Sequence, residues 1–121
     1  MGQTWLGTGW GQEWRKLVQD VIDIVDNREQ DRYEARIDGD LVGFAEYKLT
    51  PDLIVFTHTE VEPRCEGKGV GSALAKFALD DTRDQGIRKV LPLCPFIKAW
   101  IARNPTYIDL VFSRPKTTAK D

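Results

Sequence analysis

The residues whose types and spacing most clearly suggest chemistry form a glycine-rich loop, Glu66-Gly67-Lys68-Gly69-Val70-Gly71-Ser72. Three glycines at alternate positions let the backbone turn with its N–H groups converging, and no side chain blocks the close approach of a ligand. A helix is expected to begin here, so its unpaired N–H groups and the positive end of its dipole point the same way. The loop therefore favours the binding of a phosphate or pyrophosphate.

Two common phosphate-binding motifs do not fit this loop. A Walker loop requires a glycine five positions before its Gly-Lys pair, and Lys68 has none there. A dinucleotide fingerprint lies within a βαβ unit, whereas here the third glycine comes one residue early and an antiparallel meander is expected before the loop. The loop alone is equally compatible with a tight helix start that binds nothing.

Cys94 is the strongest candidate for a nucleophile. It lies between an expected strand, Lys89 to Leu93, and a helix whose first residue is expected to be Pro95. At this N-cap position the helix dipole favours a thiolate, which is the reactive, nucleophilic form of cysteine. The alternative is a small, buried, chemically inert side chain.

His58 and Glu60 are candidates for a general base. Both lie on an expected strand from Leu53 to Val61, where alternation puts Ile54, Phe56, His58 and Glu60 on one face. Residues two apart are about 7 Å apart along a strand, so the pair could serve one substrate through a water. A structural role for the single histidine is the alternative. One histidine and two separated cysteines suggest no metal site.

The elements that must position these residues follow from hydrophobic periodicity and turn signals. The pattern predicts an α+β fold: a mainly antiparallel sheet, one parallel crossover, and a strand-helix C-terminal half. In chain order the expected elements are a strand from Val21 to Val25, a hairpin of Tyr33 to Ile37 and Leu41 to Leu49 turned at Asp38-Gly39-Asp40, the strand Leu53 to Val61, a helix from Val70 to Gly86, the strand Lys89 to Leu93, a helix from Pro95 to Asn104, and a short helix from Pro105 through Val111.

The first 20 residues form a separate, Trp- and Gly-rich extension in this interpretation, before a domain at 21–112 and a flexible polar tail at 113–121. The apolar residues of the extension recur at helical spacing from Trp10 and Trp14 onward. They predict a short helix that covers an apolar surface, or an aromatic arm that binds a partner.

Composition limits the classes of partner. A chain of 121 residues with 41% hydrophobic and 30% charged residues is expected to form one globular domain. Seventeen basic and nineteen acidic residues leave a net charge of -2, which predicts neither a nucleic acid nor a membrane partner. Two cysteines, no secretory signal and no apolar run near ~18 residues lead us to expect a cytoplasmic protein, as a monomer or weak homodimer.

Several motifs in order resemble those of small, minimal members of the GNAT acetyltransferase superfamily. The similarity covers about residues 21–112 and is carried by Thr57 to Val61, Gly67 to Ala75, Val90 to Pro95 and Asn104 to Val111. One position departs from the family pattern, because Glu66 stands where Gln or Arg is usual.

The resemblance implies acetyl-CoA, or another acyl-CoA, as the bound group. Its pyrophosphate would lie on the backbone N–H groups of Gly67, Lys68, Gly69, Val70, Gly71 and Ser72. Its pantetheine arm would run beside Thr59 to Val61, and Cys94 would lie near the acyl end. In many relatives a tyrosine protonates the departing thiolate, and Tyr107 could take this role. Its ring could equally pack on Trp100 or Leu110 and do no chemistry, and we favour this packing role.

The resulting hypothesis is an N-acetyltransferase that moves acetyl from CoA to a primary amine on a small molecule or a protein. Cys94, Glu60 and His58 would be its catalytic groups, through direct attack or through an acyl-cysteine. The alternative is an acyl-CoA-binding accessory or sensor module without efficient catalysis. A third possibility is an interaction domain that binds no CoA.

Overall fold

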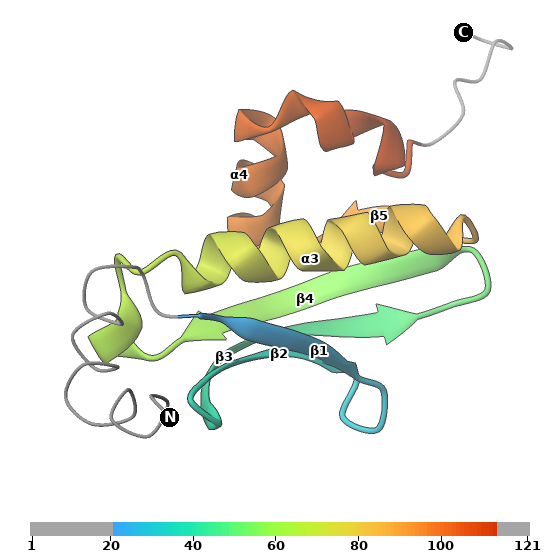
Figure 1. Cartoon of the computed structure of the whole chain (residues 1–121). Helices are drawn as coiled ribbons and strands as arrows, with labels where there is room; N and C mark the ends of the chain where they lie inside the picture. Colours follow the sequence, from blue (N-terminus) through green and yellow to red (C-terminus); the bar gives the residue numbers. More distant parts are fainter. Residues whose placement is uncertain (1–20, 114–121) are drawn as a thin grey trace, which may run out of the picture.

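A computed structural model of the protein describes residues 21–113 (Figure 1). Within them, neither α-helix combines the length and apolar character that crossing a bilayer requires. The elements in chain order are β1 (Asp23–Asn27), β2 (Arg32–Ile37), β3 (Asp40–Leu49), β4 (Leu53–Val61), the 3₁₀ helix η2 (Pro63–Cys65), α3 (Val70–Gln85), β5 (Lys89–Pro92), α4 (Pro95–Arg103) and the 3₁₀ helix η3 (Pro105–Leu110).

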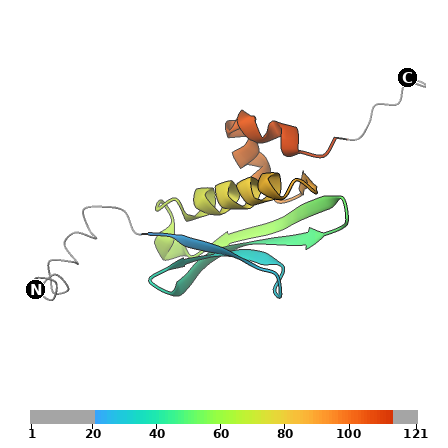
Figure 2. The same cartoon turned by 45° about the vertical axis from the view of Figure 1, so that its right-hand side comes forward.

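The five strands form one sheet in the order β1-β2-β3-β4-β5, with α3 across one face (Figures 1 and 2). The first three pairings are antiparallel, and β4 pairs with β5 in parallel because α3 connects them. Helix α4 packs against α3, β4 and β5. The expected α+β fold with a mainly antiparallel sheet is confirmed.

Most predicted boundaries hold because local signals mark them. The hairpin turns at Asp38 and Gly39, both with positive φ, and α3 ends at Gly86 with φ 67°. The first strand begins at Asp23, two residues later than expected, and η2 lies between the strand expected to end at Val61 and the helix expected to begin at Val70. The predicted N-terminal helix lies outside the described residues.

The core lies between the sheet and α3, where strand side chains meet the buried face of the helix. The largest fully buried side chains are Tyr33, Tyr47, Phe56, Leu74, Leu79, Ile97, Val42, Val70 and Val90. Close packing of this kind makes the sheet a rigid support for the strand ends, where ligands are expected to bind.

The face assignment for strand β4 is wrong in the sequence-based prediction. Phe56 pairs with Tyr47 of β3 and His58 pairs with the adjacent Glu46, so Thr57 is an extra residue in β4. Such a β-bulge interrupts the alternation of side chains. Ile54 and Phe56 therefore point into the core under α3, whereas His58 and Glu60 lie on the opposite face.

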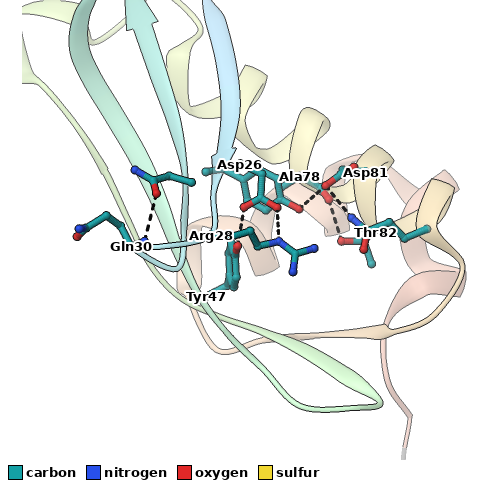
Figure 3. Close-up of polar contacts among 10 residues, drawn as sticks. Asp26, Arg28, Gln30, Tyr47, Ala78, Asp81 and Thr82 are labelled. Carbon is teal, nitrogen blue, oxygen red and sulfur yellow. Dashed lines mark hydrogen bonds and ion pairs between the residues drawn. The ribbon is translucent and has the colours of Figure 1, made fainter.

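Two buried tyrosines join elements that are not neighbours in the sheet. The Tyr47 hydroxyl donates to Asp26 of β1 at 2.5 Å, and Asp26 also accepts from Arg28 at 2.7 Å (Figure 3). The Tyr33 hydroxyl donates to Asp81 of α3 at 2.7 Å. Burial is the main cause that raises the pKa of both tyrosines, and the hydrogen bonds to carboxylates raise it further. Both hydroxyl groups therefore stay protonated and act as donors. These bonds hold β1 and α3 in place at the end of the sheet remote from the glycine loop.

Candidate functional site

The sheet opens between β4 and β5 at the carboxyl ends of these strands. Their pairing ends at Phe56 and Pro92, and the Phe56 carbonyl accepts from the N–H groups of both Leu93 (3.0 Å) and Cys94 (2.9 Å). The chain then turns into α4 at Pro95, while β4 continues to Val61. This last part of β4, residues 57–61, thus remains paired with β3 on one side and diverges from β5 on the other. Such a divergence is expected for a ligand crevice.

Cys94 lies on the wall of this opening and is 3% exposed. It is the N-cap residue of α4, as the sequence predicted, but its side chain makes no capping hydrogen bond. Its Sγ lies 3.3 Å from Oγ1 of Thr59, across the opening on β4. The sulfur therefore lies at the positive end of a helix dipole and within reach of one hydroxyl group.

The Thr59 hydroxyl is a functional candidate that sequence reasoning missed. We assigned Thr59 only a backbone role beside a ligand, because nothing in the sequence links it to a residue 35 positions away. The bulge at Thr57 supplies that link, since it turns Thr59 rather than His58 toward Cys94.

The glycine loop presents a group of N–H donors at the start of α3. Gly67 (φ 87°) and Gly69 (φ 84°) adopt the left-handed conformation, and Gly69 is the N-cap residue. Within residues 21–113, Lys68 N–H bonds to Cys65 and Ala73 N–H bonds to Gly69. No described residue accepts a hydrogen bond from the N–H groups of Gly67, Gly69, Val70, Gly71 and Ser72. Such a group suits an anion.

The third glycine has a different role from the one expected. Gly71 lies inside α3 without a positive φ, and a Cβ built on it would be 2.8 Å from Cζ of Phe96 in α4. Its small size allows the two helices to pack, whereas at Gly67 and Gly69 a Cβ would meet nothing within 4 Å. The expectation that three glycines let the backbone turn is therefore wrong for Gly71, whose conformation does not require glycine.

The side chains of the remaining predicted binding residues do not converge on a common ligand position. The Ser72 hydroxyl accepts from Trp100 Nε1 at 2.8 Å, which leaves its backbone N–H as the group available to a ligand. Val70 is buried, and Val61 pairs with Gly43 of β3. Exposed Glu66 adds a carboxylate beside the donor group.

His58 and Glu60 form an exposed pair on the face opposite α3. His58 Nε2 lies 3.6 Å from Glu60 Oε1, with the side chains 55% and 63% exposed. The His58 ring lies 6.1 Å from that of Phe44. A groove of about 210 Å³ runs beside them and is lined by Phe44, Glu60, Glu62 and the adjoining residues of β3 and β4. The structure therefore brings His58 and Glu60 together but separates them from Cys94 by the thickness of the sheet.

Tyr107 packs its ring against Trp100 at 5.2 Å between centroids, and its hydroxyl donates to Asp80 at 2.7 Å. The bond to Asp80, followed by burial, raises the pKa of Tyr107. This contact favours the packing role over proton donation to a thiolate. Residues 21–113 contain no group of three His, Cys, Asp or Glu side chains arranged to hold a metal ion.

A mainly antiparallel sheet that opens between β4 and β5, beside a helix that begins in a glycine loop, is the arrangement of a small acetyltransferase of the GNAT type. The chain belongs to the GCN5-related N-acetyltransferase family, whose sequence profile matches residues 32–110. Membership supports acetyl transfer as the general class of activity.

A solved structure of a similar protein agrees with this fold. The solution structure of a GCN5-like protein from Staphylococcus aureus aligns with a TM-score of 0.58 and 19% identity, over 82% of this chain and 96% of that one. The ribosomal-protein-alanine N-acetyltransferase from Brucella melitensis biovar Abortus 2308 aligns with a TM-score of 0.49 and 22% identity. That alignment covers 72% of this chain and 64% of the Brucella protein, so the chain spans less than two thirds of its length. None of the curated proteins compared with the chain matches it.

Proposed function

We propose that this protein is an acetyl-CoA-dependent N-acetyltransferase whose acceptor is a primary amine. The observation that carries the proposal is the crevice between β4 and β5, where buried Cys94 faces Thr59 beside the N–H donors of the glycine loop. Family membership supplies the general class of reaction.

The residues present fit acetyl-CoA. Five N–H groups without a partner among the described residues suit a diphosphate at the start of α3. The backbone of Thr59 to Val61, which diverges from β5, suits an extended amide-bearing arm that adds to the sheet like a strand. When bound, acetyl-CoA supplies a thioester, an activated acyl group with a thiolate leaving group.

Two routes for the acetyl group are open, and they differ in the role of Cys94. In the direct route the amine nitrogen forms the new bond to the acyl carbon while the carbon–sulfur bond to CoA breaks. In the covalent route the Cys94 sulfur first forms a bond to the acyl carbon while the carbon–sulfur bond to CoA breaks and CoA leaves as a thiolate. The amine nitrogen then forms its bond to the acyl carbon while the bond to Cys94 breaks and regenerates the thiolate. The Thr59 hydroxyl orients the sulfur in either case.

The acceptor amine reaches the acyl group through the opening between β4 and β5, from the face that carries His58 and Glu60. An ammonium group must lose a proton before it attacks, and Glu60, paired with His58, is an exposed carboxylate suited to accept it. The adjoining groove, with Phe44, Glu60 and Glu62 in its lining, provides room for a cationic acceptor on this face. Access from this side agrees with the bulge that places both residues there.

The test is an assay of CoA release by the full chain with acetyl-CoA and a panel of amines and amino-terminal peptides. Intact mass measured before the acceptor is added shows whether one acetyl group is bound to the protein. Cys94→Ala abolishes turnover and the added mass in the covalent route, and keeps most turnover in the direct route. Cys65→Ala, the matched variant at the other cysteine, should change neither. If no acceptor in the panel is acetylated, the proposed acetyltransferase activity is refuted.

A second candidate is a module that binds acyl-CoA without efficient catalysis. Two observations favour it: Glu66 places a carboxylate beside the anion site, and the candidate base lies on the other face of the sheet from Cys94. A ligand at ~100 times its Kd stabilises the native state by about 2.7 kcal/mol, which thermal unfolding resolves. Stabilisation by CoA without acetyl transfer would favour this module over the enzyme.

A further inference from the structure

An apolar groove lies between β1 and the exposed side of α3, away from the acyl-CoA crevice. It has a volume of about 360 Å³ and is lined by Ile22, Asp23, Ile24, Ala73, Lys76, Phe77 and Asp80. Since β1 is the first strand in the sheet order, the groove follows an edge that no described strand covers.

Large apolar side chains at the groove are incompletely covered by the described residues. Phe77 is 41% exposed, although its ring packs edge-to-face with that of Tyr33 at 6.0 Å between centroids. Val21, the first described residue, is 68% exposed. Ile22 and Ile24 are only partly buried against the core. Apolar side chains gathered along one groove are typical of a surface that binds another segment.

The chain itself provides a segment of suitable length and pattern at this position. Residues 1–20 join the described domain at Val21, next to Ile22 in the groove lining. Their apolar residues Trp10, Trp14, Leu17 and Val18 lead to Val21 at spacings that form one stripe on a helix. Twenty residues span up to about 30 Å as a helix, which is longer than the 16-residue helix α3 that forms one wall of the groove.

We propose that residues 1–20 bind in the groove between β1 and α3 of the same chain, with their tryptophan stripe against Phe77, Ile22 and Ile24. The segment then covers the edge of β1 and completes the core on that side. Because it is tethered at Val21, its effective concentration at the groove is high even if its affinity as a free peptide is low. This docking does not depend on the acetyl-transfer activity.

The test uses trypsin, because Arg15 and Lys16 lie within this segment, between Trp14 and Leu17. In the native full chain, cleavage after these residues should be slow. Phe77→Ser should speed it about tenfold, since cleavage follows the population of the undocked state. Ile87→Ser, which removes an equally apolar side chain that is 63% exposed and outside the groove lining, should leave the rate unchanged. Cleavage after Arg83, within α3, measures global unfolding and corrects for any loss of stability in Phe77→Ser.

A double-mutant cycle distinguishes docking from an indirect effect. Trp14→Ser should also speed cleavage after Lys16, and the variant carrying both changes should be cleaved no faster than either single variant. Additive effects, or equal rates for Phe77→Ser and Ile87→Ser, would overturn the proposal. Protection that declines on dilution would also overturn it, because the segment would then be bound by a second copy of the chain.

Discussion

The contact between Gly71 and Phe96 permits a quantitative test of how α3 and α4 pack at the glycine loop. We consider Gly71→Ala in the native sequence and in a Phe96→Ala background. In the native sequence the new Cβ would lie 2.8 Å from the Phe96 ring, well inside normal contact distance. In the second background the three atoms nearest to the new Cβ, which all belong to the Phe96 ring, are gone.

The expected magnitudes follow from two opposing effects. Alanine is favoured over glycine inside a helix by up to about 1 kcal/mol. Overpacking costs about 1–3 kcal/mol, at the lower end here because Phe96 is 36% exposed and its ring can move outward. Gly71→Ala should therefore lower the free energy of unfolding by about 0–2 kcal/mol in the native sequence and raise it by about 0.5–1 kcal/mol without the ring.

The assay is urea unfolding followed by circular dichroism, with Gly69→Ala as the control. At Gly69, φ is 84° and a Cβ would meet nothing, so the cost should be backbone strain of about 1–2 kcal/mol in both backgrounds. If Gly71→Ala has the same effect with and without the ring, within about 0.5 kcal/mol, the steric explanation is refuted.

Three further changes test other contacts. Thr59→Val removes the hydroxyl group beside Cys94 at nearly constant side-chain volume. If the sulfur reacts as a thiolate, the lost hydrogen bond is worth about 1.5–3 kcal/mol, so acetyl transfer should slow roughly 10- to 100-fold. The control Thr59→Ser keeps a hydroxyl group and should retain most of the activity. Burial opposes ionisation of Glu34, but hydrogen bonds from Arg32, Asn27 and Arg36 outweigh it and lower its pKa below the ordinary 4.5. The stability that ionised Glu34 contributes is thus fully present above about pH 4.5 and is lost as the pH falls through the lower pKa of the folded state. The difference in unfolding free energy between the native protein and Glu34→Gln should therefore become smaller on acidification. A difference that does not depend on pH would contradict this account. Tyr47→Phe removes the buried bond to Asp26 and should cost about 1–3 kcal/mol in urea unfolding; no change in the midpoint would show that this bond does not hold β1.

Local signals were enough to predict most helices and strands, and also the position of Cys94 in the candidate site. The Asp38-Gly39 turn, the apolar period after Val70 and the left-handed cap at Gly86 act within a few residues, so they marked the β2–β3 hairpin and α3. Pro95 likewise placed Cys94 at the start of α4. The order of these elements then limited the topology to one mainly antiparallel sheet with a parallel crossover.

Pairing and packing between distant segments decided which groups face one another. The bulge at Thr57 depends on how β4 matches β3, so strand alternation alone put His58 and Glu60 on the wrong face and concealed the contact of Thr59 with Cys94. The role of Gly71 likewise depends on a ring 25 positions later, which only the packing of α4 on α3 brings into contact. A sequence pattern reports the preferences of a segment, whereas these contacts arise from the register and close packing of several segments at once.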